Sequence, residues 1–346
     1  MAESRTIWFD FDNTPHVQYL FPLTELLRDK GYSILFTARD YSQTVPLLSS
    51  KQVIFKIIGR GFGSSKAGKI LGTLSRTGGL FRHVIKHQPL AAFSSSRACS
   101  FTAFLLGIPS FVFCDYEHVE LSSYQWMGAF LVVPDVIPKQ VFTEKGFSPE
   151  KIISFPGLKE DISLYGIDFD LFQPLLQSDL VTAVLRPPAE EGHYFFKESL
   201  NITRATLDYL SRRQDVLVVF SPRYAYQVDL LNQYTWINRP VRLVKPAPFI
   251  SLMKSADLVI SSGGTMLREA AVLGVSAYSI LANRQGAVDQ YLHSKGVLEF
   301  ISGPQDVIQK LRLEKRNSQI QYQKKTETID FVIQETLSRI KQGKIN

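Results

Sequence analysis

The chain has 346 residues, of which 45% are hydrophobic, and this length and composition are typical of a globular protein with two domains. Its two cysteines, Cys99 and Cys114, are too few for a disulfide framework, and no apolar run reaches the roughly 18–20 residues that a membrane-spanning helix needs. The formal net charge of +7 favours anionic partners without distinguishing nucleotide, nucleic acid and membrane.

Short apolar segments alternate with longer segments of helical spacing along the first half of the chain. We expect helices at 15–30 and 98–107, between strands at 6–10, 33–37, 53–58, 90–94, 110–114 and 129–133. This alternation predicts an α/β fold, in which parallel strands form a sheet with helices on both faces. Ligands of such sheets bind outside the carboxyl ends of the strands, so the residues that follow each strand are the first candidates for a site.

The first expected strand ends in the run DFDNT, residues 10–14. The run resembles the Asp-x-Asp-x-Thr signature of haloacid-dehalogenase-type phosphatases, in which the first Asp attacks a phosphoryl group. Such an enzyme also needs an acidic pair after a late strand to hold magnesium, and the late segments LVISSGG and AYSILANRQG contain none. Thr14 as N-cap, Pro15 at the first helical position and Gly31 at the helix end instead favour a strand-to-helix turn.

The alternation resumes in the second half, with strands expected at 180–185, 216–220, 241–244, 257–261 and 275–281. Two runs of similar size predict two Rossmann-like domains. We expect the first at 1–160, a linker at 161–178, the second at 179–325, and an amphipathic C-terminal helix at 326–346.

The segment ADLVISSGGTMLREAAVLGV, residues 256–275, predicts a strand, a tight turn and a helix. Its turn residues, Ser262, Gly263, Gly264 and Thr265, would offer backbone N–H groups and a helix N-terminus to a diphosphate. Glu269 follows within the helix, where a carboxylate can bind both hydroxyls of a ribose. A tight turn with a solvated glutamate is the alternative that this segment leaves open.

Polar and cationic residues follow three further strands of the second half. Arg186 comes after the first strand and Arg223 after the next. Gln285, Asp289 and Gln290 follow the last expected strand. Because the carboxyl ends of parallel strands meet at one edge of a sheet, the groups after all four strands suit a nucleoside-diphosphate sugar.

The order GGT…E…LG…NRQ…DQ…G resembles the donor half of GT-B glycosyltransferases. Relatives of that group include the N-acetylglucosaminyltransferase that makes lipid II and the non-hydrolysing UDP-N-acetylglucosamine 2-epimerases. The segments WFDFDNTPHVQYLFPL, TARD at 37–40 and CDYEH at 114–118 are similar to an uncharacterised archaeal and bacterial family of predicted glycosyltransferases. The resemblance covers nearly the whole chain and implies a GT-B fold, with two Rossmann-like domains facing a central cleft.

The resemblance also implies an activity: a metal-independent glycosyltransferase, without cofactor, that moves a sugar from a nucleoside-diphosphate sugar to an acceptor that the sequence does not identify. The donor diphosphate would lie on Ser262–Thr265, with Arg186 or Arg223 balancing the charge of the leaving group. Glu269 would hold the ribose. The sugar hydroxyls would be held by Gln285, Asp289 and Gln290.

An acceptor hydroxyl needs a general base, and His16 beside the first helix is the first candidate. Asp115, Glu117 and His118, which follow a strand of the first domain, are the alternates. The candidates for substrate binding in the first loop are Asn13 and Thr14. A polar residue that satisfies a helix cap is the simpler interpretation of His16.

Two other functions fit the same residues. A nucleoside-diphosphate-sugar 2-epimerase would use the same donor pocket, with acid and base groups in place of an acceptor site. CDYEH supplies carboxylates for it, and LRPPAEE weakly resembles an epimerase segment, although Leu185 stands where those enzymes have a histidine before the arginine. A non-enzymatic binder of anions or nucleic acid is the third function, but the sequence contains no recognised nucleic-acid module, so we expect no nucleic-acid partner.

The stretch from Tyr41 to Cys114 contains no Asp or Glu. Its segment 59–87 mixes glycines and cations with bulky apolar residues, and in GT-B enzymes with lipid-linked acceptors this part faces the acceptor and the membrane. No leader precedes the first apolar run, so we expect a cytoplasmic chain that contacts an anionic inner membrane surface or a polyanionic, lipid-linked acceptor. A solvated loop over the cleft is the alternative. The cations expected at this surface are Arg60, Lys66, Lys69, Arg76, Arg82 and Lys86.

Overall fold

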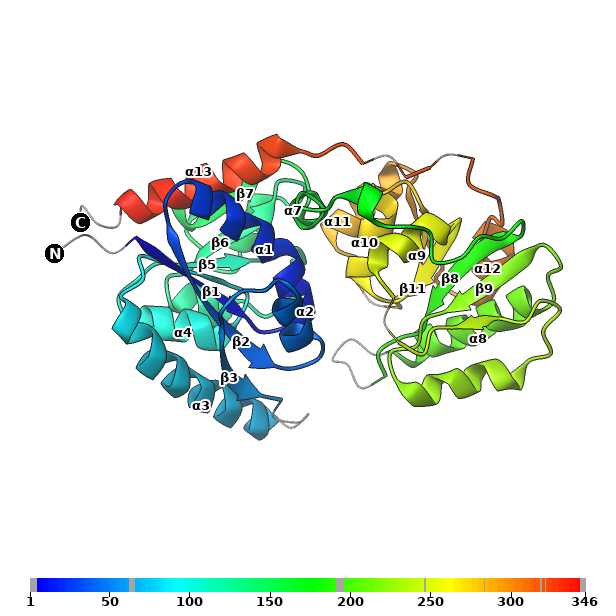
Figure 1. The fold of residues 1–346 in the computed structure, drawn as a ribbon, viewed down its shortest axis with the longest axis horizontal. Coiled ribbons are helices and arrows are strands. Elements are labelled where there is room, and N and C mark those ends of the chain that lie inside the picture. The colour runs from blue at the N-terminus through cyan, green and yellow to red at the C-terminus, as the bar shows by residue number, and fades with distance from the viewer. Residues whose placement is uncertain are drawn as a thin grey trace. The chain divides into compact units, whose positions relative to one another are not determined.

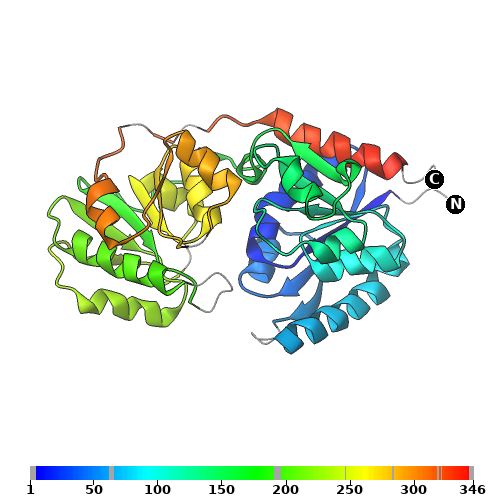
Figure 2. The same ribbon diagram turned by 180° about the vertical axis from the view of Figure 1, so that it is seen from behind.

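The computed structural model describes residues 5–61, 66–190, 196–245, 247–282, 284–317, 319–320 and 322–342, without the side chains of residues 66, 67 and 69. Figures 1 and 2 show the chain from opposite sides. It divides into two compact units: unit 1 comprises Met1–Gly166 and Lys324–Asn346, and unit 2 comprises Ile167–Gln323. Each unit has a parallel sheet and helices, which confirms the expected α/β fold class.

Unit 1 is built on a seven-stranded sheet whose described pairings are all parallel. The strand order reverses between the first and fourth strands in sequence, and this pair forms the topological switch point, where ligands bind in folds of this class. In spatial order the strands are β3 (Lys56–Arg60), β2 (Ser33–Asp40), β1 (Thr6–Phe11), β4 (Ala92–Ser94), β5 (Ser110–Phe113), β6 (Phe130–Pro134) and β7 (Ile152–Phe155).

Helices cover both faces of this sheet, and β1 shows why its sequence is apolar at nearly every position. Phe9 and Phe11 lie in one hydrophobic cluster with residues of α1 and α13, whereas Trp8 lies in another with residues of α3 and α4. Figure 1 shows the two helix pairs on opposite sides of the sheet. The helices of unit 1 are α1 (Thr14–Asp29), α2 (Thr44–Ser50), α3 (Lys66–Val84), α4 (Arg97–Leu105), α5 (Ser122–Trp126), α6 (Lys139–Thr143), α7 (Lys159–Ser163) and α13 (Thr326–Gln342), with short 3-10 turns η1 (Ile85–His87) and η2 (Pro149–Lys151).

Unit 2 has a six-stranded parallel sheet whose order reverses between β8 and β11. In spatial order its strands are β10 (Val241–Arg242), β9 (Val216–Phe220), β8 (Val181–Arg186), β11 (Leu258–Ser261), β12 (Ser276–Ser279) and β13 (Leu298–Phe300). Its helices are α8 (Lys197–Ser211), α9 (Phe249–Ser255), α10 (Gly264–Val272), α11 (Ala287–Ser294) and α12 (Pro304–Lys310), with 3-10 segments η3 (Phe169–Leu171) and η4 (Ala225–Gln233).

Every strand expected from the sequence is present, within a few residues at its ends, but the sequence patterns do not predict β7, β13 or α3. The expected linker at 161–178 also differs from the structure. Its first residues belong to α7, whose Ile162 is buried in the same cluster as Phe9, and the units divide after Gly166. The C-terminal helix α13 belongs to unit 1, so the chain passes between the units twice.

Candidate functional site

The glycine turn of unit 2 follows β11 at the switch point of its sheet. Gly263 is the N-cap of α10 and Gly264 begins the helix, whose first turn contains no acidic residue. The Gly263 N–H donates to Ser261 Oγ at 3.0 Å. The first N–H groups of a helix have no partner within the helix and carry partial positive charge, so the turn is suited to an anion.

Two arginines lie beside this turn. A Cβ atom at Gly263 would overlap Arg223 Nη2, so only glycine leaves room for the guanidinium at this place. Arg223 Nε donates to the carbonyl oxygen of Pro187 at 3.1 Å, and the Arg223 backbone N–H donates to Gln227 Oε1 at 2.9 Å. Gln227 is itself buried and donates to the Pro188 carbonyl, so the loops after β8 and β9 are joined.

The positive charges of the Arg186 and Arg223 guanidinium groups repel each other. Burial, together with the charge of Arg186, lowers the pKa of Arg223 to about 10. Burial also lowers the pKa of Arg186, whose Nε is buried and has no hydrogen-bond partner among the described residues. Like charges in partly buried surroundings are stabilised when an anion binds between them, so this pair favours a doubly or triply charged ligand.

The other residues expected around the donor lie on α10 and α11. Glu269 is buried on α10, and Thr265 lies in the first turn of the same helix. Asp289, expected to hold a sugar hydroxyl, forms an ion pair: its two carboxylate oxygens accept from Arg268 Nε at 2.6 Å and Nη2 at 3.0 Å. The ion pair between Asp289 and Arg268 therefore links α11 to α10. Gln290 is exposed and Gln285 is half-buried.

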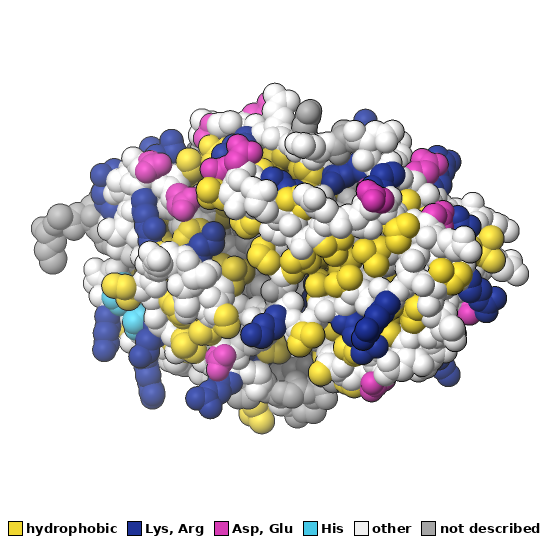
Figure 3. Space-filling view, turned by 45° about the vertical axis from the view of Figure 1, so that its right-hand side comes forward, with side chains coloured by type: hydrophobic (Ala, Val, Ile, Leu, Met, Phe, Trp, Pro, Cys, Tyr) yellow, Lys and Arg dark blue, Asp and Glu magenta, His cyan; other side chains and the backbone are white. Residues whose placement is uncertain are grey.

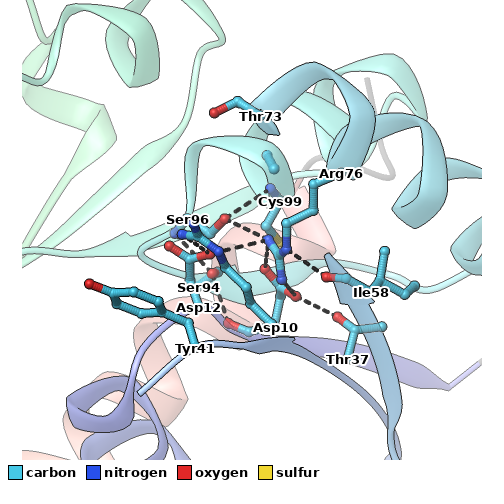
Figure 4. A network of polar contacts seen from close by, with 12 residues as sticks. Asp10, Asp12, Thr37, Tyr41, Ile58, Thr73, Arg76, Ser94, Ser96 and Cys99 are labelled. Atoms are coloured by element: carbon cyan, nitrogen blue, oxygen red, sulfur yellow. Dashed lines mark hydrogen bonds and ion pairs between the residues drawn. The ribbon is translucent and has the colours of Figure 1, made fainter. Parts of the chain in front are cut away.

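At the switch point of unit 1, Asp10 is held by a buried arginine (Figure 4). Arg76 of α3 donates to Asp10 Oδ1 at 2.7 Å and to Asp10 Oδ2 at 2.9 Å, and Thr37 Oγ1 donates to the same carboxylate at 2.6 Å. Asp10 is fully buried and Arg76 is 4% exposed. Asp10 is thus an ion-pair partner in the core, and this arrangement agrees with the strand-to-helix interpretation of the DFDNT run.

This arrangement also corrects the role expected for Arg76. The sequence analysis places Arg76 among the cations of an exposed basic surface, but its guanidinium is buried against Asp10. Two other members of that set, Lys66 and Lys69, have side chains outside the described residues, as has Phe62 of the same stretch.

The loop after β1 leads directly into α1. Asn13, rather than Thr14, is the N-cap of this helix, and its side chain accepts from the Thr14 N–H at 2.8 Å. Thr14 is the first helical residue, and its Oγ1 accepts from the Gln43 N–H at 3.0 Å. The cap lies one residue earlier than expected, because Asn13 already supplies the acceptor and Thr14 Oγ1 is bound to the Gln43 N–H.

His16 lies in the first turn of α1, with its ring edge toward Tyr19. Its Nδ1 is buried and has no hydrogen-bond partner in the part of the chain that the structure describes. Burial lowers the pKa of His16, against the opposing charges of Asp12 and Asp10. The imidazole is therefore neutral near pH 7 and able to accept a proton, as a general base must.

The alternate bases lie after β5. Asp115 pairs with Lys159 of α7 at 2.6 Å, and Glu117 lies 3.5 Å from His118. The charges of Asp115 and Lys159 both act on the pKa of His16, so these residues share one region of unit 1. Lys159 is the functional candidate that the sequence analysis misses, because the helix that carries it follows the unexpected strand β7.

Within the described ranges, no group of three or more His, Cys, Asp or Glu side chains could hold a metal ion. No described helix is both long and apolar enough to cross a bilayer.

Comparison with known proteins finds a family and a relative that are similar to this chain in sequence. A family model described as "Protein of unknown function (DUF354)" matches residues 5–341. An uncharacterised protein of Methanocaldococcus jannaschii is 28% identical over 323 residues, which cover 87% of this chain and 91% of that relative.

Solved structures match at lower identity. The UDP-GlcNAc 2-epimerase of Neisseria meningitidis, bound to UDP-GlcNAc, has a TM-score of 0.72 and 14% identity, covering 96% of this chain and 100% of its own. MurG of Acinetobacter baumannii has a TM-score of 0.52 and 14% identity, covering 97% and 95%. These matches confirm the GT-B fold, which this chain shares with glycosyltransferases and UDP-GlcNAc 2-epimerases.

Proposed function

We propose that this chain, which belongs to the family described as "Protein of unknown function (DUF354)", is a glycosyltransferase that takes its sugar from a nucleoside-diphosphate sugar without a catalytic metal. One observation carries the proposal. The guanidinium groups of Arg186 and Arg223 are partly buried, repel each other and lie at the glycine turn that begins α10.

A diphosphate would relieve this unfavourable pairing. Its charges would be met by the two guanidinium groups and by the free N–H groups of the first turn of α10. The same groups would stabilise the nucleoside diphosphate as it leaves, because negative charge increases on that group as the bond to the sugar breaks. The protein's own cations would thus do what a bound metal does in other transferases.

Glu269 is the proposed partner of the ribose. It is buried on the helix that begins at the glycine turn, and a carboxylate there could accept from two ribose hydroxyls. Gln285 and Gln290 remain the proposed contacts of the donor sugar. Since Asp289 is bound to Arg268, we now assign it to orienting the start of α11.

Unit 1 would supply the acceptor half of the reaction. His16, neutral near pH 7, is the proposed base that takes the proton of the acceptor hydroxyl, and the alternates remain Asp115, Glu117 and His118. We expect transfer to fall off only below the ordinary histidine pKa of about 6.5, because burial holds the pKa of His16 below that value. A profile of kcat/KM against pH measures this limb.

Nucleotide binding tests the proposal directly. A thermal-shift screen of the full chain against nucleotides and sugar nucleotides should find a ligand that adds about 2.7 kcal/mol of stability at about 100 times its Kd. Arg223→Met should weaken binding of that ligand at least tenfold. Arg212→Met, at the exposed C-cap of α8, is the matched control and should leave binding unchanged. Failure of every nucleotide to bind would contradict the proposal.

The ribose assignment has its own test. Glu269→Ala should lose about 1.5–3 kcal/mol of nucleotide binding, which is typical of hydrogen bonds to a charged group. A 2′,3′-dideoxy nucleotide should lose a similar amount with the unaltered protein and nothing further with the variant. Equal binding of ribose and dideoxy ligands by the unaltered protein would show that Glu269 does not hold the ribose.

One observation favours a 2-epimerase as the second candidate. Asp115 and Glu117 bring two carboxylates to the region around His16 and Lys159, and an epimerase needs acid and base groups there rather than an acceptor. Incubation with a sugar nucleotide alone distinguishes the two activities. Conversion of the sugar without acceptor would identify an epimerase, whereas release of nucleoside diphosphate only when acceptor is present would identify a transferase.

Unit 1 also supports the proposed contact with an anionic surface. On α3 the large apolar side chains Ile70, Leu71 and Leu74 are exposed, and the cations Arg60, Arg82 and Lys86 nearby in sequence are exposed as well. On the face that Figure 3 draws, lysine and arginine side chains are interspersed with acidic and hydrophobic side chains. A lipid-linked acceptor would be reached from such a surface.

Co-sedimentation with liposomes tests this contact. Binding should require anionic lipid and fall with salt, since each basic residue near the surface contributes about 1 kcal/mol. Replacing Arg60, Arg82 and Lys86 by Gln should abolish it. Arg212→Gln, at the C-cap of α8, should not reduce binding. If the unaltered protein ignores anionic liposomes at low salt, the acceptor is not reached from a membrane.

A further inference from the structure

Arg76 joins four segments of unit 1 around a single guanidinium (Figure 4). Besides its two bonds to Asp10 at the end of β1, its Nε donates to the Ile58 carbonyl of β3 at 2.9 Å. Its Nη1 donates to Ser96 Oγ at 2.9 Å, and Ser96 is the N-cap of α4. The loops after β1 and β4, which flank the switch point, are therefore tied to one buried group on α3.

The same guanidinium reaches toward the loop that leads to His16. Arg76 Nη1 lies 3.6 Å from Asp12 Oδ1, and Arg39 Nη1 lies 3.4 Å from the same oxygen. The Asp12 side chain is 25% exposed, unlike the fully buried Asp10. Asp12 and its partner Arg39 thus both have access to solvent at the sheet edge, while the buried Arg76 holds Asp12 from inside the unit.

Stability alone does not account for such a network. A buried ion pair gives up much of its Coulombic gain to desolvation, and apolar replacements of similar volume are often as stable. The Arg76–Asp10 pair also fixes the position of the partly exposed Asp12 carboxylate, two residues later in the chain. An apolar core could not do this.

We propose that Arg76 is a positioning residue of the acceptor half, which holds Asp12 at the start of the helix that carries His16 and so sets the charge around that imidazole. The inference rests on the proposed function in one respect, the role of His16 as base. Arg76 itself touches neither substrate nor the reacting atoms in this scheme. It acts through Asp12.

The charges that face His16 come from three elements. Asp12 and Asp10 at the end of β1 and Asp115 after β5 raise the pKa of His16, and Lys159 of α7 lowers it, while burial lowers it most. Among the charged groups Asp12 has the largest effect. Removing its carboxylate should therefore lower the pKa of His16 further, and misplacing it should do the same to a smaller extent.

The first experiment follows His16 by NMR titration in the full chain, with its signal assigned through His16→Asn. Asp12→Asn should lower the pKa of His16 by about 0.5–1 unit. Arg76→Lys keeps the charge but cannot make the bidentate bond and the two further bonds together, so it should shift the His16 titration in the same direction. Arg82→Lys, on the exposed side of the same helix, is the control and should shift nothing.

The second experiment measures transfer. Arg76→Lys should lower kcat tenfold or more through misplacement of the loop, with the donor KM unchanged, because the proposed donor site lies in unit 2. Asp12→Asn should move the acid limb of the pH profile to lower pH. If Arg76→Lys does not fold, an unmoved His16 titration in Asp12→Asn still overturns the proposal, because Arg76 acts only through Asp12.

The outcomes separate the two proposals. Without any transferase activity, a shifted His16 titration in both variants would sustain the positioning role and overturn the proposed function. With activity present, an unmoved His16 titration in Asp12→Asn would overturn the positioning role. So would an unchanged kcat in a folded Arg76→Lys.

Discussion

At the turn before α10, the Arg223 guanidinium occupies the space that a side chain at Gly263 would need. The backbone of Gly263 has an ordinary φ of −100°, which any residue can adopt, so glycine is required there by the guanidinium and not by the chain's conformation. Gly263→Ala should therefore fold, at the cost of about 1 kcal/mol that alanine brings at an N-cap, while displacing the Arg223 side chain. We expect nucleotide binding to weaken at least tenfold, as measured by calorimetric titration.

The control for this substitution is Gly303→Ala. Gly303 is the N-cap of α12, also in unit 2, and a Cβ there meets no atom within 4 Å. Gly303→Ala should cost about 1 kcal/mol in stability, as alanine does at an N-cap, and leave nucleotide binding intact. Wild-type affinity in Gly263→Ala would mean that Arg223 does not contact the ligand from its present position.

The sheet-edge positions of three proposed donor residues could be predicted, because each lies at the end of a strand or shortly after it. Arg186, Arg223 and Gly263 need only the strand positions and the rule that parallel strands end at one edge. The pairing of Arg76 with Asp10 could not be predicted in this way, because the two are 66 residues apart and only the packing of α3 brings them together. The pairing of Asp289 with Arg268 could not be predicted either, because nothing in the sequence around Asp289 indicates that partner.

Among the elements, α3 is a helix that its glycines make difficult to predict from the sequence. Its sequence KAGKILGTLSRTGGLFRHV contains four glycines, and each lowers helix propensity by about 1 kcal/mol relative to alanine. Packing outweighs this cost, because Leu80 and Val84 are fully buried against Trp8 and α4. The strands β7 and β13, of four and three residues, are not predicted either, and their shortness alone does not explain this, because the equally short β4 and the shorter β10 are predicted.

Two adjacent glycines of α3 should respond oppositely to alanine. A Cβ at Gly78 meets no atom within 4 Å, whereas one at Gly79 would lie 2.9 Å from Ile58 Cγ2 of β3. Gly78→Ala should raise the free energy of unfolding by about 0.5–1 kcal/mol through helix propensity. Gly79→Ala should lower it by about 1–3 kcal/mol through overpacking. Chemical denaturation measures both, and equal effects would contradict the packing of α3 on β3.

At the scale of the whole molecule, two sheets each reverse their strand order once and each place a helix N-terminus at the reversal. In unit 1 the reversal lies between β1 and β4 and holds His16 and Asp12; in unit 2 it lies between β8 and β11 and holds the arginine pair. The alternation of strands and helices predicts two such units from sequence. It does not predict that α13 returns to unit 1, since an amphipathic helix does not indicate in its sequence which core it covers.

The return of α13 gives each unit its own core, with a consequence for unfolding. The cluster around Phe9 contains residues of α13 and of unit 1 only, and the cluster around Phe220 contains residues of unit 2 only. Calorimetry should therefore resolve two transitions, which substitutions in the two cores shift separately. Ile333→Ala, in α13, should lower the unit 1 transition, because loss of a fully buried isoleucine costs about 2–5 kcal/mol. Leu210→Ala, in α8, is the matched change for unit 2 and should lower only the other transition.

A nucleotide ligand then identifies the unit that binds it. Since a ligand stabilises only the unit whose folded form it binds, the nucleotide should raise the transition that Leu210→Ala lowers and leave the other unmoved. The shift should persist in Ile333→Ala and vanish in Arg223→Met. A nucleotide that raised the Ile333-sensitive transition instead would place the donor in unit 1 and reverse the assignment of the two halves.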